Sequence, residues 1–490
     1  MSIFQRVLST ILCSCMVLYV VFAGVNQQIN NEEPTITNGE SVVIWYTDEA
    51  MTDYLSACAV AFHEKYDVRV IPQLHSGLEY LESVYDASVR GEDVPDLYII
   101  SNEALEKAYL AGLASEITDM QGVVNTKNFP VAALNAVSYD GIIVGYPYYF
   151  ETSVLLYNQS YIYESAKNIL MAAETNDDST GEAEDNQAAS KVTEVSEEEI
   201  QTKISEMLPT TFDGLLSFAN EYDAPANVET VFKWDVSDIF YNYFFVGNYL
   251  NVGGSCGDDP EQIDIYNLDA IKAMQVYQDM NQFFAFETED LTYDSVIQEF
   301  IEGKVVLTTA TSDVIKRLDS AKEEGAFTYE YGLKEIPDLN EEMQTKSMSV
   351  TNTLVINGLS DKQDAANLFA TYLIDEEISS LYQKTGKIPS RTSAAVADEK
   401  TKVFYEEYSE SAPVPKMMVT SNFWVELEIT FSNIWSGKGV SKCMQSLSEM
   451  IMEQVTGAEY EEEYIDEPTE ETTIEYLDEE VEREAAKKAE

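Results

Sequence analysis

The segment from Asp140 to Gln159 constrains the fold of this chain more than any other. Two apolar runs, Ile142–Tyr146 and Val154–Tyr157, flank a centre that holds three aromatic rings and Glu151. Such runs, rich in β-branched and aromatic residues, are typical of strands that helices cover on both faces. A carboxylate between two buried strands is costly unless it faces something polar. We therefore expect the chain to leave one sheet here, cross a cleft and enter another, so that the crossing segment lines a ligand site.

The first part of the chain alternates strand-like and helix-like segments. Apolar runs at residues 41–47, 68–71 and 96–100 alternate with helical patterns at 51–66, 78–89 and 102–113. This succession indicates an α/β fold with a parallel sheet, in which ligands bind at the carboxyl ends of the strands. The residues at two such strand ends are Tyr46, Thr47, Asp48, Ser101, Asn102 and Glu103.

The charge of the chain excludes some partners. The 490 residues include 29 Lys+Arg and 88 Asp+Glu, which gives a formal net charge of −59. A polyanion is repelled by phosphate backbones and anionic lipid headgroups, so we expect no nucleic-acid partner. Two acidic segments with few large apolar residues are expected to be disordered, an insertion at 172–199 and a tail at 458–490.

The N-terminal residues indicate export. An uncharged apolar run, Val7 to Gly24, predicts a signal peptide or membrane anchor over residues 1–25, followed by a polar tether over 26–40. The protein is therefore expected outside the cytoplasm, either released or tethered to the outer face of the membrane. Within the run, Leu12–Cys15 is similar to a lipoprotein box. The remaining cysteines lie too far apart for a disulfide framework or a zinc site: Cys58, Cys256 and Cys443. We expect no metal and no cofactor.

Several stretches, in order, resemble one family. They are Val94–Ile100 with Tyr109–Thr118, Gly145–Asn158, Phe300–Leu307, Gly386–Arg391 and Asn422–Trp424. Together they resemble the extracellular solute-binding proteins of bacterial ABC importers, in the branch of maltodextrin-binding protein. The resemblance covers residues 41 to 457, and its weight lies in the ordered spacing of pieces that are individually weak.

The resemblance implies a two-lobed, periplasmic-binding-protein-like fold in which each lobe is a mostly parallel sheet flanked by helices. Hinge strands join the lobes, which close on the ligand by bending. The expected boundaries are 41–149 plus 352–398 for the N-terminal lobe and 150–351 plus 399–457 for the C-terminal lobe. The implied function is capture of a small solute, a carbohydrate, and its delivery to the membrane subunits of an ABC importer. We expect a monomer.

A neutral sugar is held by carboxylate and amide groups on its hydroxyls and by aromatic rings on its C–H faces. The candidate ligand-binding residues are Thr47, Asp48, Ser101, Asn102, Glu103, Tyr149, Glu151, Trp234, Asp238, Thr311, Asp313 and Trp424. Each has a structural alternative, since tryptophans also fill cores and carboxylates also solvate surfaces. Of the three stacking tryptophans of the maltodextrin-binding pattern only Trp424 has a counterpart, which disfavours maltodextrin itself.

Two alternatives remain open. A cationic ligand such as a polyamine fits carboxylates and rings as well as a sugar does, and could be bound by a sensor without a transport role. No Arg or Lys stands at the matched cleft positions, which disfavours an anionic ligand. A glycoside hydrolase could use paired carboxylates such as Glu103 and Glu151. With only His63 and His75 in the chain, no nucleophile–His–acid set is evident, and we expect a binding protein without catalytic residues.

Overall fold

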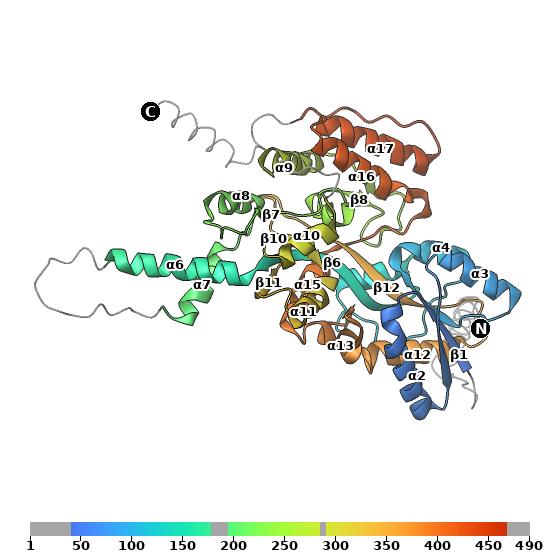
Figure 1. Ribbon diagram of the computed structural model, residues 1–490. Helices are drawn as coiled ribbons and strands as arrows, with labels where there is room; N and C mark the ends of the chain where they lie inside the picture. The colour runs from blue at the N-terminus through green and yellow to red at the C-terminus, as the bar shows by residue number, and fades with distance from the viewer. Residues whose placement is uncertain (1–40, 178–194, 285–290, 468–490) are drawn as a thin grey trace, which may run out of the picture.

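A computed structural model describes residues 41–177, 195–284 and 291–467. It contains a ten-stranded sheet with the order β2-β1-β3-β12-β6-β10-β7, in which β11 and β13 also pair with β6 and β14 pairs with β12 (Figure 1). The predicted export segment and tether, residues 1–40, lie outside the described residues. Within the described part of the chain no helix is long and apolar enough to cross a membrane.

The strands are β1 (Ser41–Tyr46), β2 (Arg69–Leu74), β3 (Leu97–Ser101), β4 (Ser138–Tyr139), β5 (Ile142–Ile143), β6 (Tyr146–Asn158), β7 (Thr230–Phe232), β8 (Asn251–Val252), β9 (Ile263–Asp264), β10 (Val305–Thr311), β11 (Tyr331–Lys334), β12 (Met348–Ile356), β13 (Ile388–Pro389) and β14 (Ala412–Pro413). The α-helices are α2 (Thr52–Tyr66), α3 (Tyr80–Arg90), α4 (Leu105–Leu110), α5 (Val131–Ala136), α6 (Gln159–Asp177), α7 (Glu197–Met207), α8 (Phe212–Glu221), α9 (Leu268–Phe284), α10 (Tyr293–Ile301), α11 (Asp313–Glu323), α12 (Gln363–Asp375), α13 (Leu381–Thr385), α14 (Thr392–Ala395), α15 (Glu399–Glu410), α16 (Phe423–Trp435) and α17 (Val440–Thr456).

The first lobe is built on β1, β2 and β3, which run parallel. Successive side chains of a strand point to opposite faces of a sheet. On β1, Ile44 and Tyr46 therefore join a core that includes α2 and α12, whereas Trp45 joins a second core that includes α3 and α4. Helices cover both faces of these strands (Figure 1), as the alternating pattern of the sequence predicts.

Strand β6 connects the two lobes without interruption, which corrects the expectation of two strands separated by a cleft crossing. It pairs antiparallel with β12 near its start and with β10 and β11 near its end. Its central aromatic residues are buried: Phe150, for example, stacks on Tyr408 of α15 with ring centroids 3.9 Å apart. Glu151 lies at the cleft, so its carboxylate does not break the strand. The proposed lobe boundaries stay a prediction.

The second lobe packs its helices around an aromatic core. This core joins α6 to α9 with α16 and α17, and it includes Trp234, Phe245, Tyr277 and Trp435. Helix α8 begins where the side chain of Thr211 accepts a hydrogen bond from the Gly214 amide, and threonine is a favoured residue at this position. Helices α16, α17 and α9 lie together at one end of the molecule (Figure 1).

The two segments expected to be disordered are partly ordered. Helix α6 continues to Asp177, and α7 begins at Glu197 behind a capping box formed by Ser196 and Glu199. Both ends of the predicted 172–199 insertion are therefore helical, and residues 178–194 lie outside the described residues. The start of the predicted tail also packs on α17, where Ser448 donates a hydrogen bond to Glu462 (2.7 Å). The local composition did not reveal these contacts, because acidic residues that cap a helix or pack on one have the same composition as solvated ones. The tail beyond residue 467 lies outside the described residues.

Candidate functional site

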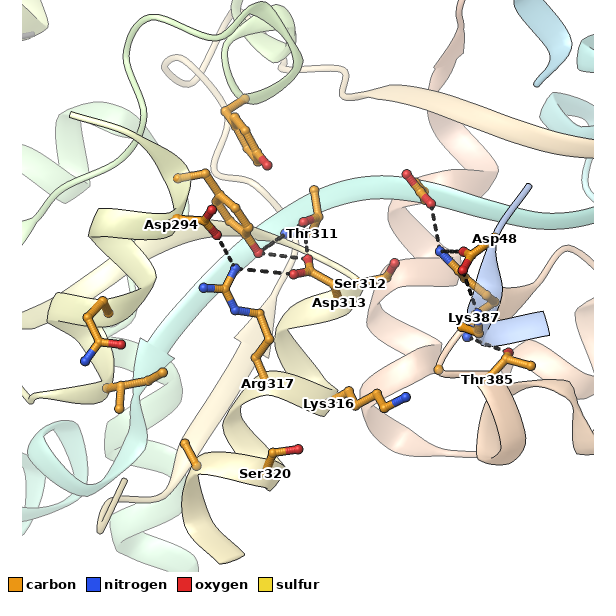
Figure 2. A pocket seen from close by; sticks show the side chains of 18 of the residues that line it. Asp48, Asp294, Thr311, Ser312, Asp313, Lys316, Arg317, Ser320, Thr385 and Lys387 are labelled. Carbon is orange, nitrogen blue, oxygen red and sulfur yellow. Dashed lines mark hydrogen bonds and ion pairs between the residues drawn. The ribbon is translucent and has the colours of Figure 1, made fainter. Parts of the chain in front are cut away.

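A hollow of about 980 Å³ lies between the lobes and is lined by both. One wall consists of Asp48, at the end of β1, and the turn between α13 and β13. The other consists of Asp238, the short helix η4 (Ile239–Tyr241) and the helices α10 and α11. Figure 2 shows the two walls, with the ion pairs of each on its own side of an open space. We refer to this hollow as the cleft.

The first wall is organised by Lys387. Its Nζ lies 2.8 Å from Asp48 Oδ2 and 3.5 Å from Glu151 Oε1, and it sits 5.6 Å from the centre of the Tyr149 ring. Burial opposes ionisation of Asp48, but hydrogen bonds from Lys387 and from the Ala50 amide outweigh it and lower the pKa of Asp48. Burial would lower the pKa of Lys387, and the two carboxylates raise it overall. Asp48 and Lys387 are thus both charged at neutral pH.

The second wall is organised by Arg317. Its Nη1 lies 2.7 Å from Asp294 Oδ1 and 3.5 Å from Asp313 Oδ2, on the same helix four residues before it. Asp313 also accepts a hydrogen bond from the Tyr293 hydroxyl at 3.0 Å. The ring of Tyr241 stacks on Tyr293 with centroids 4.6 Å apart, which leaves an aromatic surface beside the carboxylates. Burial raises the pKa of both tyrosines well above the ordinary value, so their hydroxyls stay protonated and donate.

A second hollow, of about 370 Å³, adjoins the cleft at Asp48. It lies at the carboxyl ends of β1 and β3, where Thr47 and Ser101 line it together with Tyr149. This is the position that the rule for parallel sheets predicts for a ligand.

The structure brings together eight of the twelve candidate residues. Those that line the cleft are Asp48, Glu151, Asp238, Thr311 and Asp313. Those that line the smaller hollow are Thr47, Ser101 and Tyr149, with Asp48 shared. Their assignment to a ligand stays a proposal.

The other four candidates line neither hollow. Asn102 is fully buried, and its side chain donates to Val414 O (2.9 Å) and accepts from the Thr351 amide (2.9 Å). Glu103 accepts a hydrogen bond from the Ser101 hydroxyl at 3.2 Å. Trp424 packs edge-on against Tyr243 at 5.5 Å.

The expectation that Trp234 offers a stacking face is wrong. Its side chain is 0% exposed in the core of the second lobe, where the indole N–H donates to Asn242 Oδ1 at 2.8 Å. A ring enclosed on all sides has no face left for a ligand. The aromatic-dense segment around it is therefore core, which was the structural alternative.

Sequence reasoning missed the basic side chains of the cleft. Lys316, Arg317 and Lys387 all line it, so the expectation that no basic residue lies there is wrong. Two signals were available. Arg317 follows Asp313 by four residues on a helix, a spacing that puts both on one face. Lys387 lies in the Gly386–Arg391 stretch that carried the family resemblance.

Comparison with known proteins identifies the family. A family model described as "Bacterial extracellular solute-binding protein" matches residues 57–408. The chain belongs to this family. It is 21% identical over 419 residues to the maltodextrin-binding protein MdxE of Bacillus subtilis (strain 168), a match that covers 84% of this chain and 88% of that protein.

Solved structures of similar proteins share the fold. An extracellular solute-binding protein of Staphylococcus aureus in complex with maltose aligns with a TM-score of 0.68 at 17% identity, covering 87% of this chain and 99% of that one. The maltose-binding periplasmic protein MalE of Listeria monocytogenes, also with maltose, aligns with a TM-score of 0.65 at 19% identity, covering 87% and 100%. The expected two-lobed α/β fold is thereby confirmed. Within the described residues no cluster of three or more His, Cys, Asp or Glu side chains could hold a metal ion.

Proposed function

We propose that this protein captures a carbohydrate in the cleft between its lobes and delivers it to an ABC importer. The observation that carries the proposal is a hollow of about 980 Å³ lined from both lobes by hydrogen-bonding groups and tyrosine rings. Carboxylates such as Asp48 and Asp313 accept hydrogen bonds from sugar hydroxyls, and the face of Tyr241 packs on sugar C–H groups. The names of the similar proteins, which bind maltose or maltodextrin, support the same class of ligand.

Capture proceeds by hinge closure in this proposal. The strands β6 and β12 pass between the lobes as a hydrogen-bonded pair, with Glu151 opposite Val350. A change in their twist would bring Asp48 and Lys387 toward α11 without breaking either strand. Such bending about a few connecting residues is a common way for two-lobed proteins to enclose a ligand.

The family supports a setting outside the cytoplasm and an ABC importer as partner. In this proposal the protein is a monomer, either released or tethered to the outer face of the membrane, and its partners are the sugar and the membrane subunits of the importer. A binding role is favoured over hydrolysis because Glu103 lines neither hollow, so it does not face Glu151 across a cavity that could hold a glycosidic bond.

The test is titration calorimetry with mono- and oligosaccharides, both neutral and amine-bearing, on the wild type and on Asp48→Asn. The variant removes the charge that Lys387 pairs with, and we expect at least a tenfold loss of affinity, or about 1.4 kcal/mol. Asp53→Asn, an exposed carboxylate on α2, is the matched control and should bind as the wild type does. Absence of binding by every saccharide, or release of reducing ends from an oligosaccharide, would overturn the proposal.

A further inference from the structure

The charges that line the cleft do not balance. Six carboxylates line it, contributed by Asp48, Glu151, Asp238, Asp294, Asp313 and Glu324, and three basic side chains, Lys316, Arg317 and Lys387. A cavity with an excess of one sign and walls of low dielectric concentrates ions of the opposite sign. The cleft therefore attracts cations.

Two of the three basic side chains are already engaged in ion pairs with cleft carboxylates. Lys387 is shared between Asp48 and Glu151, and Arg317 is shared between Asp294 and Asp313. Each of these groups of three side chains keeps one negative charge. Lys316 extends from the second wall toward Gly386 of the first, and its Cδ lies 3.2 Å from where a Cβ would be if residue 386 were alanine. The positive charge of Lys316 helps to lower the pKa of Asp48.

Two of the cleft carboxylates, Glu324 and Asp238, form no ion pair with a basic side chain among the described residues, and aromatic rings lie beside Asp238. The Oδ1 of Asp238 accepts a hydrogen bond from the Phe240 amide at 2.8 Å. Burial raises the pKa of Asp238, the Phe240 amide offsets part of this rise, and the nearby Asp235 adds to it. The rings of Phe240 and Tyr241 line the cleft beside it. A carboxylate flanked by aromatic rings is the arrangement that holds an ammonium group.

A second observation points to a ligand in the same space. Ser312 is 6% exposed, and its hydroxyl has no hydrogen-bond partner among the described residues, not even as a cap on α11. It lines the cleft beside Asp313 and points into the space between the two walls (Figure 2). Because this hydroxyl opens onto the cleft and makes no hydrogen bond within the described residues, a polar group of a ligand can become its partner.

Closure of the two lobes also favours a cationic ligand. Both walls carry net negative charge, so bringing them together raises their mutual repulsion, and water that screens it is expelled. A neutral sugar leaves this repulsion in place. A protonated amine between the walls converts it into attraction.

We propose, on the basis of the proposed function, that the solute is an amino sugar whose free ammonium group lies between Asp238 and the ring of Tyr241 and whose hydroxyls reach Ser312. The chemistry that selects it is the protonated amine on a polyol. A polyamine offers the same charge without the polyol, and the experiment separates the two.

The test compares oligomers of glucosamine with oligomers of N-acetylglucosamine of equal length by calorimetry at pH 6, with maltotetraose and spermidine as further probes. Acetylation removes the charge and keeps the sugar. We expect the free amine to bind at least tenfold tighter, with an affinity that falls as salt rises. Asp238→Asn keeps an acceptor for the Phe240 amide and should abolish the preference, whereas Asp53→Asn should keep it. Should Asp238→Asn not fold, Asp294→Asn, which is exposed, is the second variant and should reduce the preference.

Each outcome decides between the two proposals. Equal affinity for the free and acetylated oligomers, or binding of maltotetraose alone, would overturn the amine inference and leave the carbohydrate function standing. Binding of spermidine without any saccharide would overturn the carbohydrate function and leave the ammonium site standing. Binding of none of the probes would overturn both.

Discussion

Replacing Glu407 with glutamine tests how strongly the fold opposes a buried charge. Glu407 lies on α15, and its Oε2 accepts a hydrogen bond from the Ile336 amide at 3.1 Å. Burial raises its pKa from 4.5 to about 7, although the hydrogen bond from the Ile336 amide acts in the opposite direction. The folded protein thus holds a proton on this carboxyl that the unfolded chain releases near pH 4.5.

The sign and size of the effect follow from this shift. Because the pKa is raised on folding, the stability is fully present below about pH 4.5 and is lost as the pH rises through 7. The difference of roughly 2.5 pH units, at about 1.36 kcal/mol per unit, amounts to about 3 kcal/mol at pH 8 and about 1 kcal/mol at pH 5. Glutamine keeps an acceptor for the Ile336 amide and cannot ionise, so it avoids this loss.

The assay is urea denaturation followed by circular dichroism at pH 5 and pH 8. We expect Glu407→Gln to raise the free energy of unfolding by about 3 kcal/mol at pH 8 and by about 1 kcal/mol at pH 5. Glu410→Gln, on the exposed end of the same helix, is the control and should change stability by only a few tenths of a kcal/mol. A gain that does not depend on pH, or a loss at pH 8, would refute the reasoning.

Two further predictions concern the tail and the cleft. Ending the chain after Gly457 removes the hydrogen bonds that Ser441 and Ser448 of α17 make with Ile465 and Glu462, and it should lower Tm by about 5 °C. Ending the chain after residue 467 keeps these hydrogen bonds and is the control. Equal Tm values for the two truncations would contradict the prediction. Replacing Lys387 with methionine leaves Asp48 subject to burial without its main hydrogen-bond donor, so NMR titration should find the pKa of that carboxyl raised above its lowered wild-type value. A pKa that does not move would mean that Lys387 does not hold Asp48.

Local patterns predicted the first lobe well. Residues 41–47, 68–71 and 96–100 form β1, β2 and β3 with small shifts at the ends, because strand runs and helix periods are set by neighbouring residues. The same pattern predicted that the candidate site lies at the carboxyl ends of the parallel strands, where Thr47, Asp48 and Ser101 all line a hollow.

Contacts between distant residues were not predictable in the same way. Glu151 suggested a break in the strand because its partner, Lys387, lies 236 residues later and only the folded chain joins them. Trp234 suggested a stacking face, but its exposure depends on Phe284 and Trp435, which pack against it from α9 and α16. The basic residues Lys316 and Arg317 of the cleft were missed for the same reason, since their position depends on how α11 faces the opposite lobe.

The continuity of β6 across both lobes affects how this protein folds and unfolds. Since β10 and β11 of the second lobe add to a strand that β12 holds in place beside β3, neither half can finish its sheet alone. A fragment that contains only one lobe would expose sheet edges with unpaired backbone N–H and C=O groups, and such edges promote aggregation. The protein should therefore melt in one step, and a copy that has formed only half of its sheet is the form most exposed to proteases.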